Sequence, residues 1–374
     1  MLIGIDTFGA DHGRSGIGLY LLSLLSKLPK LDSISYELFG SEIDRYNFTT
    51  SNNFSFTGIS IPDSVLSEFI WHLTRASSFS VKRGYDVTLY SAGGRFLPTN
   101  FKVPGVAVVN DVISELPSFN QGSFFAKKIK KGFMNCTKII VASQFIKKEL
   151  VSMSINPEKI EVIHNGIDHS LFYPRTELTG DVVEIKPFAI KRPYFIYASK
   201  LQGPAKKHVE LIRAFSVFKK KTGLPHRLIL AGGAGPYFDT VHKEVMDSPY
   251  GSDIFLTGFF PHENLSELYS CADACIVPSV GEGVGMPVLE AMASGVPVAC
   301  AKAGALPEIA GSNALFFSPD DIGSMADAME TIILDKTLRE KLHADGIAWA
   351  KRFSWEKTAS KTLEVLCQAA KTRK

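Results

Sequence analysis

The sequence lacks the features that would place the chain across a membrane, in an oxidising compartment or on nucleic acid. Its 374 residues contain no apolar run of about 18 residues, and residues 1–6 show a strand pattern rather than a signal peptide. Its five cysteines form no CxxC motif, so we expect buried, reduced thiols and a cytoplasmic protein. A formal net charge of +3 is too small to indicate nucleic-acid binding.

Two ligand-binding motifs are also missing. The glycines near the N-terminus do not form the GxGxxG fingerprint, which argues against a nicotinamide-dependent oxidoreductase although the strand pattern would suit one. No acidic DxD cluster accompanies the candidate phosphate-binding residues, and His164 and His208 stand alone, without metal-ligand spacing. We therefore expect neither a metal nor a cofactor.

The length and the periodic pattern indicate two α/β domains. A chain of 374 residues is longer than a single core usually grows. Strand-like runs alternate with helical patterns in both halves, which predicts two doubly wound, Rossmann-like domains. The predicted strands are 2–6, 36–39, 86–90, 106–109, 138–141, 160–163, 194–198, 227–231, 254–256, 274–277 and 296–299. The predicted divisions are an N-terminal domain at 1–172, a linker at 173–192, a second domain at 193–353 and a final helix at 354–374.

A turn between two acidic residues, Glu282 and Glu290, is the strongest candidate site. Gly283 and Gly285 let the backbone approach a ligand closely, and a helix begins directly after them. The free N–H groups of that helix would attract a phosphate, and Glu290 could accept hydrogen bonds from ribose hydroxyls. The same pattern also fits an ordinary strand–turn–helix with solvated acids.

Other polar groups are predicted at the same kind of position, where a strand meets a helix. Gly16 and Gly18 open the first helix, where they either bind an anion or a sugar or simply make a tight turn. The pair at 110–111 follows a buried strand, so it belongs to a cleft or to a loop turn. A loop at 200–208 brings Lys200, Lys206 and Lys207 to the second sheet, where they could neutralise a diphosphate.

A basic amphipathic helix is predicted at 124–134, with four lysines at nearly helical spacing. Such a helix can lie on an anionic membrane surface. It can equally be packed on one face and solvated on the other.

A series of short motifs resembles the retaining glycosyltransferases of the GT-B fold, glycosyltransferase family 4. The resemblance covers essentially the whole chain and is densest from 256 to 355. The motifs lie at 15–20, 139–143, 162–168, 200, 206–207, 278–279, 282–290, 295–298, 306–311 and 353–356. Each is weak alone, and their joint order makes the resemblance specific.

The resemblance implies two Rossmann-like domains facing a central cleft, with a nucleotide sugar on the C-terminal domain and the acceptor on the N-terminal domain. It implies that Glu290 binds ribose, that Glu282 binds the transferred sugar, and that Lys207 stabilises the diphosphate together with Lys200 or Lys206. The expected catalytic residues are Glu282, Lys207 and Lys200. The expected donor-binding residues are Glu290, Lys206, Gly283, Val284, Gly285, Met286 and Gly18. The expected acceptor-binding residues are Gly16, Asn110 and Asp111.

The implied reaction is metal-independent transfer of a hexose with retention at the anomeric carbon. The segment 16–20 is similar to mannosyltransferase-like members, so GDP-mannose is the first expected donor and a UDP-sugar the alternative. The expected acceptor is a saccharide or a polyprenyl-diphosphate-linked saccharide in cell-surface polysaccharide synthesis, such as O-antigen. The enzyme would then be cytoplasmic and peripheral at the inner face of the membrane.

The chain departs from the family pattern at two positions. Asn110 stands where the family often has a histidine, and Lys200 stands where it often has an arginine, which removes the bidentate fork of a guanidinium but keeps the charge. The asparagine leaves open a second hypothesis, a catalytically silent protein that binds nucleotide sugars.

Overall fold

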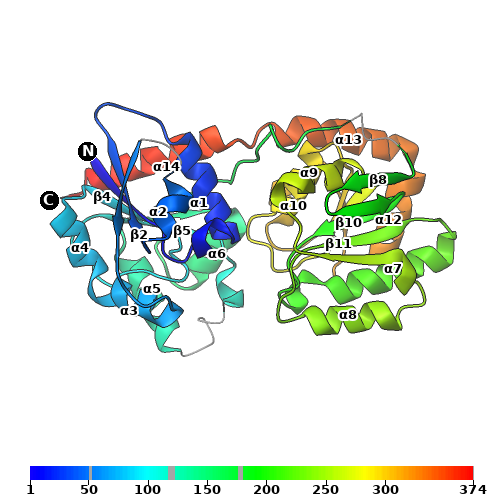
Figure 1. Ribbon diagram of the computed structural model, residues 1–374, viewed down its shortest axis with the longest axis horizontal. Coiled ribbons are helices and arrows are strands. Elements are labelled where there is room, and N and C mark those ends of the chain that lie inside the picture. Colours follow the sequence, from blue (N-terminus) through cyan, green and yellow to red (C-terminus); the bar gives the residue numbers. More distant parts are fainter. Residues whose placement is uncertain (50–52, 117–122, 176–179, 374) are drawn as a thin grey trace. The chain divides into compact units, whose positions relative to one another are not determined.

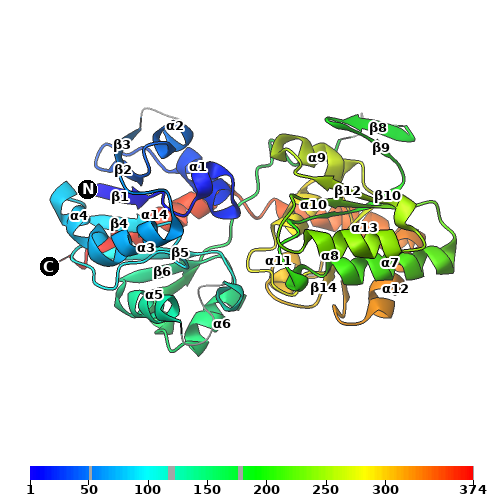
Figure 2. The same ribbon diagram turned by 60° about the horizontal axis from the view of Figure 1, so that its bottom comes forward.

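The chain folds into two compact units (Figure 1). The computed structural model describes residues 1–49, 53–116, 123–175 and 180–373. The first unit comprises Met1–Gly166 together with Trp355–Lys374, and the second is Ile167–Ser354. Each unit contains a parallel sheet with helices on both faces (Figures 1 and 2). The predicted α/β fold with two doubly wound halves is therefore confirmed.

The first unit is built on a seven-stranded parallel sheet with the order β3-β2-β1-β4-β5-β6-β7. Its strands are β1 (Leu2–Asp6), β2 (Ser35–Gly40), β3 (Phe54–Gly58), β4 (Val87–Tyr90), β5 (Gly105–Val109), β6 (Lys138–Val141) and β7 (Ile160–Val162). Strands β4 and β5 are buried along their whole length, as expected for parallel strands that are covered on both faces. In register, Ile3 lies between Tyr36 on one side and Val87 on the other.

Several helices of the first unit begin at a serine N-cap. These helices are α1 (Gly16–Lys27), α3 (Val65–Thr74), α5 (Phe124–Asn135) and α6 (Gln144–Ser152), capped by Ser15, Ser64, Ser123 and Ser143. In each case the serine side chain accepts a backbone N–H of the first turn, which satisfies a donor that the helix cannot pair itself. The first unit also contains α2 (Asp44–Phe48) and α4 (Ala76–Arg83).

The last helix, α14 (Trp355–Ala370), also belongs to the first unit. It packs against α1 and against strands β4, β5 and β6. The rings of Tyr20 and Trp355 lie 5.8 Å apart, and an ion pair of 2.7 Å joins Lys27 to Glu356. The chain therefore leaves this unit, builds the second one and returns to complete the first.

The second unit is built on a six-stranded parallel sheet with the order β12-β11-β10-β13-β14-β15. Its strands are β10 (Tyr194–Ala198), β11 (Arg227–Ala231), β12 (Ile254–Gly258), β13 (Ala274–Val277), β14 (Val298–Ala301) and β15 (Leu315–Phe317). Its helices are α7 (His208–Thr222), α8 (Phe238–Asp247), α9 (His262–Ser270), α10 (Met286–Ala293), α11 (Leu306–Ala310), α12 (Ile322–Leu334) and α13 (Lys336–Ala350). The strand order reverses between β10 and β13, and ligands of such sheets bind where the loops after these strands diverge.

The structure differs from the sequence prediction at the linker and at three strands. The chain passes from the first unit to the second between residues 166 and 167 and returns between residues 354 and 355. The predicted divisions were 172–173, 192–193 and 353–354. Within the predicted linker, whose residues 176–179 lie outside the described part, an antiparallel hairpin joins β8 (Val182–Ile185) to β9 (Phe188–Lys191). Phe188 packs on Phe255 and Phe260 of the second unit, so an aromatic contact holds this segment in place. Strands β3 and β15 were not predicted, and β14 begins two residues later than expected.

Among the described residues, no helix is long and apolar enough to cross a membrane.

Candidate active site

The loops that follow β10 and β13 are held together at the point where the second sheet reverses its strand order. The backbone N–H of Val280 donates to the carbonyl oxygen of Ala205 at 2.9 Å. The Lys206 ammonium donates to the carbonyl oxygen of Gly281 at 3.3 Å and to Oε2 of Glu282 at 2.7 Å. The structure thus brings Lys206 and Glu282 together. The motif spacing alone could not predict this pairing.

Glu282 is fixed from several sides. Its Oε1 accepts the backbone N–H of Gly285 at 3.4 Å, and its own carbonyl oxygen accepts the N–H of Ala305. A Cβ atom at Gly304 would lie 2.8 Å from that carbonyl oxygen, so only glycine allows the two loops to approach so closely. The carboxylate is 13% exposed, which leaves it accessible while its backbone is locked.

The three lysines of the loop have different surroundings. Lys206 faces Glu282, whereas Lys207 is ion-paired with Glu210 at 2.9 Å and with Asp320 at 3.0 Å. These carboxylates raise the pKa of Lys207, chiefly through the hydrogen bond that the ammonium donates to Glu210. Lys207 also has a positive φ of 56° and is the N-cap of α7. Lys200 is exposed.

Helix α10 starts at the glycine turn as the sequence predicted. Gly285 takes a left-handed conformation with φ 75° and serves as its N-cap, Pro287 lies in the first turn, and Gly295, with φ 75°, follows its end. A Cβ at Gly285 would lie 3.2 Å from Ile309, so the turn is both strained and tightly packed against α11 for any other residue. Gly283 is buried, and Val284 and Met286 are half-buried beside it.

Glu290 lies in the middle of α10 and is only 7% exposed. The hydroxyl of Tyr269, which is fully buried, donates to its Oε2 at 3.1 Å. Burial and the neighbouring Glu290 charge raise the pKa of Tyr269 well above its usual value, so the phenol remains a donor. Sequence reasoning missed Tyr269, because nothing in the pattern of α9 distinguishes it from an ordinary core aromatic residue.

A buried polar layer lies next to the lysine loop. His208, the first residue of α7, and Tyr197, near the end of β10, are both fully buried, and their ring centroids are 5.0 Å apart. Within the described residues, the two ring nitrogens of His208 and the hydroxyl of Tyr197 have no hydrogen-bond partner. Burial, with a smaller contribution from Lys206, lowers the pKa of His208 to about 4, so the ring is neutral near pH 7.

In the first unit, the predicted acceptor residues also lie at the carboxyl ends of strands. Gly16 is exposed, with open space where a Cβ would stand, whereas Gly18 is buried and donates its N–H to Ser15. A Cβ at Gly18 would lie 2.3 Å from the carbonyl oxygen of Ala10, so this glycine is explained by packing. Asn110 follows β5, and its buried amide nitrogen has no hydrogen-bond partner among the described residues. Asp111 pairs with Arg95 at 3.0 Å.

A buried hydrogen bond between His72 and Asp6, which the sequence did not reveal, supports the loop between β1 and α1. Nε2 of His72 lies 2.7 Å from Oδ2 of Asp6, and its Nδ1 lies 2.7 Å from the carbonyl oxygen of Glu68. The ring therefore links Asp6, at the end of β1, to the backbone of α3. Oδ1 of Asp6 accepts the N–H of Phe8 at 3.0 Å, which fixes the first residues of the loop.

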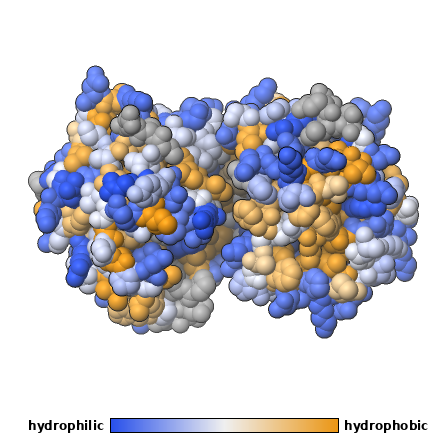
Figure 3. Space-filling view, in the orientation of Figure 1, coloured by the Kyte–Doolittle hydropathy of each residue, from blue (hydrophilic) through white to orange (hydrophobic). Residues whose placement is uncertain are grey.

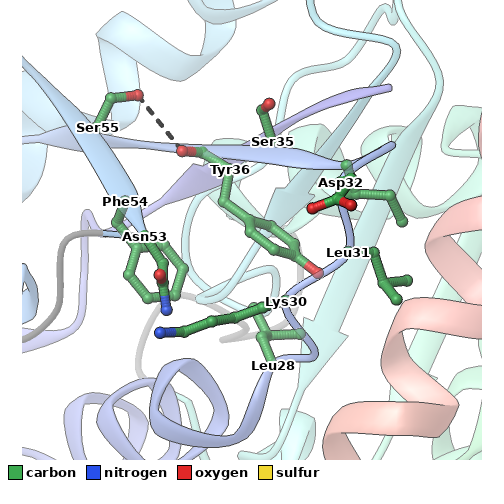
Figure 4. Close-up of a pocket in the computed structure, with 10 residues that line it drawn as sticks. Leu28, Lys30, Leu31, Asp32, Ser35, Tyr36, Asn53, Phe54 and Ser55 are labelled. Carbon is green, nitrogen blue, oxygen red and sulfur yellow. Dashed lines mark hydrogen bonds between the residues drawn. The ribbon is translucent and has the colours of Figure 1, made fainter.

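A pocket of about 590 Å³ lies at the amino-terminal ends of β2 and β3 (Figure 4). This end of the first sheet is opposite to the carboxyl ends of the strands, where the predicted acceptor residues lie. Its lining includes Lys30, Asp32, Tyr36 and Asn53. The Tyr36 hydroxyl donates to the carbonyl oxygen of Pro29 at 2.9 Å, and Ser55 donates to the carbonyl oxygen of Tyr36. None of the predicted site residues lies in this pocket.

Comparison with known proteins connects these two units with sugar transfer. A model of the glycosyl transferases group 1 matches residues 183–349, and a model of glycosyltransferase family 4 matches residues 102–171. The O-antigen chain mannosyltransferase B of Escherichia coli is 27% identical over 285 residues, which cover 75% of this chain and 74% of that protein.

Solved structures share the fold over the whole chain. Sucrose-phosphate synthase from Thermosynechococcus elongatus has a TM-score of 0.77 at 18% identity, with 98% of both chains covered. HepE from Anabaena, in complex with UDP and glucose, has a TM-score of 0.73 at 17% identity, with 98% of this chain and 100% of that chain covered.

The two Rossmann-like sheets and the matched family models define a glycosyltransferase of the GT-B fold. Within this class, the matches support a glycosyltransferase of the family 4 type, the family that the sequence motifs resemble.

Proposed function

We propose that the protein is a retaining, metal-independent hexosyltransferase that takes its sugar from a nucleotide diphosphate. The observation that carries this proposal is the pairing of Lys206 with Glu282 where the second sheet reverses, next to the helix that holds Glu290. Lys206 would bind the diphosphate of such a donor, the accessible carboxylate of Glu282 would bind its sugar, and the buried carboxylate of Glu290 would bind its ribose. The relative named a mannosyltransferase supports mannose from GDP-mannose as the first choice, and the structure with UDP and glucose supports a UDP-sugar as the alternative.

Lys206 is the better candidate of the two adjacent lysines for the diphosphate. Its ammonium already faces the turn before α10, whereas the Lys207 ammonium is engaged by Glu210 and Asp320. The exposed Lys200 on the same loop would supply a second charge. The N-terminal amides of α10 would add their partial positive charge.

The proposed catalysis is electrostatic. As the bond from the anomeric carbon to the diphosphate breaks, negative charge grows on the leaving oxygen, and a cation fixed in place stabilises that charge without reorganisation. Glu282 would accept hydrogen bonds from hydroxyls of the sugar, and Glu290, oriented by Tyr269, would accept those of the ribose. The departing phosphate would help to remove the proton of the acceptor hydroxyl, so that the new bond forms on the same face.

The donor set around the loops supports charge neutralisation by lysine. Lys206 lies 2.7 Å from Glu282, within the turn itself. We propose that Lys206, together with the exposed Lys200, neutralises the charge of the diphosphate.

The acceptor is proposed to be a saccharide, or a saccharide on a polyprenyl diphosphate, in cell-surface polysaccharide synthesis. Gly16 and Asn110 in the first unit are candidates for binding it, since one leaves open space and the other presents an unpartnered amide. We place the enzyme in the cytoplasm, at the inner face of the membrane, where the lysines of α5 would contact anionic lipids.

Purified protein incubated with a panel of nucleotide sugars and a lipid-linked acceptor tests this proposal. We expect one donor to be consumed in the presence of a chelator, with a product whose anomeric configuration, measured by NMR, matches that of the donor. An inverted product would refute retention, and activity that a chelator abolishes would refute metal independence.

A catalytically silent binder of nucleotide sugars is the second candidate. The unpartnered amide of Asn110, where family members often have histidine, favours it. Thermal stabilisation by GDP or UDP without turnover on any acceptor would support this alternative. Stabilisation by NAD alone would contradict both sugar-binding hypotheses.

A further inference from the structure

The loop between β1 and α1 has an unusual backbone. Four of the five residues from 9 to 13 have a positive φ, and two of these, Asp11 and His12, are not glycines, with φ of 49° and 52°. Residues with a side chain rarely adopt this left-handed conformation, and strained backbone of this kind is concentrated at functional sites. The strain therefore singles out Asp11 and His12 as candidates for a role beyond packing.

Hydrogen bonds within the loop hold this conformation. The N–H of Gly13 donates to the carbonyl oxygen of Ala10 at 3.0 Å, and the N–H of Arg14 donates to the carbonyl oxygen of Asp11 at 2.9 Å. The backbone on both sides of His12 is therefore fixed, and so is the direction in which its side chain leaves the loop.

His12 reaches a buried carboxyl group. Its Nδ1 lies 2.7 Å from Oδ1 of Asp44 in α2, and Oδ2 of Asp44 accepts the hydroxyl of Thr7 at 2.5 Å. A Cβ at Gly40, the last residue of β2, would clash with the Thr7 hydroxyl and lie 2.9 Å from Oδ2 of Asp44, so this glycine leaves room for the group. The side chain of Asp44 is 3% exposed, whereas that of His12 is 27% exposed. Asp44 is thus the buried support, and the imidazole is the part that a ligand can reach.

The surroundings of His12 favour a neutral ligand that donates hydrogen bonds. Asp44 belongs to a group of carboxylates that influence one another: burial, followed by the charges of Asp6, Asp63 and Asp44, raises the pKa of Glu68 to about 7. These charges would repel an anionic group, whereas a hydroxyl donates a hydrogen bond without bringing a charge. Hydrophilic side chains also lie over the start of α1 in the view of Figure 3. A saccharide fits both conditions.

We propose that His12 is an acceptor-binding residue: its Nδ1–H donates to the ionised Asp44, and its bare Nε2 accepts a hydrogen bond from a hydroxyl of the acceptor saccharide. Among the described residues, Nε2 of His12 has no hydrogen-bond partner. The carboxylate fixes both the tautomer and the orientation of the ring, so the acceptor hydroxyl is held at a defined place. The loop follows β1, where the first sheet reverses its strand order toward β4, and ligands of such sheets bind at this point. This inference rests on the proposed function and adds a residue to Gly16 and Asn110 as acceptor candidates.

NMR of the histidine ring nitrogens in isotope-labelled protein tests the tautomer. We expect the neutral ring of His12 to carry its proton on Nδ1. We also expect its Nε2 signal to shift when an octyl glycoside of mannose, glucose or N-acetylglucosamine is added in the presence of GDP or UDP. The signals of His12 are assigned by their loss in the His12→Asn protein. A proton on Nε2, or an Nε2 signal that none of the glycosides moves, would overturn the proposal.

Calorimetric titration with the same octyl glycosides separates binding from a structural role. His12→Asn keeps an amide that can donate to Asp44 and tolerates a left-handed backbone, but it has no atom at the place of Nε2. We expect it to weaken glycoside binding about tenfold, while the Kd for GDP or UDP and the unfolding free energy stay those of the parent. His12→Gln has a longer amide that can reach the place of Nε2, so its glycoside binding should stay within about threefold of the parent.

The matched control is His242→Asn, which replaces an exposed histidine of α8 and should bind the glycosides like the parent. The proposal is overturned if His12→Asn binds the glycosides as tightly as the parent, if His12→Gln loses as much binding as His12→Asn, or if the parent binds GDP or UDP but none of the glycosides. A parent that binds glycosides through His12 but neither nucleotide contradicts the proposed function and leaves this inference standing.

Discussion

Replacing the buried His208 by leucine should make the second unit resistant to mild acid. The imidazole is fully buried, packs at a tilt against the ring of Tyr197 and has no hydrogen-bond partner within the described residues. Burial lowers its pKa from 6.5 to about 4 in the folded protein, whereas the unfolded chain titrates near 6.5. Between these values the unfolded state binds the extra proton, so the free energy of unfolding falls as the pH falls from about 6.5 to about 4.

The size of the effect follows from the shift of the pKa. One pKa unit corresponds to about 1.4 kcal/mol, so the unfolding free energy should drop by about 2 kcal/mol between pH 7 and about pH 5, and by about 3 kcal/mol at about pH 4. His208→Leu removes this term. At neutral pH the leucine also replaces a polar ring that has no partner, which should be neutral or stabilising by about 1 kcal/mol.

Urea unfolding of the parent and the variant at about pH 7 and about pH 5 measures this difference. The exposed His242→Leu in the same unit is the matched control, and its acid sensitivity should equal that of the parent. Equal acid sensitivity of the parent and His208→Leu would refute the conclusion that the buried ring is held neutral.

Three further predictions concern the site and its support. Lys206→Ala should lower kcat about 100-fold or more, while Lys207→Ala should stay within about a factor of three of the parent, and equal losses would contradict the assignment. Tyr269→Phe should raise the calorimetric Kd for the nucleoside diphosphate about tenfold, because Glu290 loses a hydrogen bond, and an unchanged Kd would exclude this positioning role. Asp6→Asn should destabilise the first unit by about 1–3 kcal/mol in denaturant unfolding, since it weakens the buried hydrogen bond to His72, and parent-like stability would argue against a structural role for this bond.

The central elements of both units could be predicted because their signals are local. Pro287 near its start and Gly295 after its end predicted both ends of α10, and the predominantly apolar strands β5, β6 and β10 stood out by composition. Strands β3 and β15 were missed because β3 is largely half-exposed and β15 has three residues. The hairpin β8–β9 was missed because prolines at both its turn and its end looked like a linker, while its stability comes from distant aromatic residues.

The candidate site was predictable in its residue types and not in its pairings. Spacing predicted the lysines and acids as candidates, and the sequence could not decide between Lys206 and Lys207. In the structure Lys206 pairs with Glu282, whereas Lys207 pairs with Asp320, which is more than 100 residues away in the chain. Tyr269 and the pair of Asp6 with His72 act through contacts between distant segments, for which a single sequence carries no signal.

Helix α14 gives the order of protein synthesis a structural consequence. The second unit is one uninterrupted segment, 167–354, and can close as soon as it leaves the ribosome, whereas the first unit waits for its last helix. Until residues 355–373 emerge, the surface of α1 and of strands β4 to β6 that α14 covers stays open to solvent. The first unit is therefore assembled from two segments far apart in the sequence, and its core closes only when α14 docks.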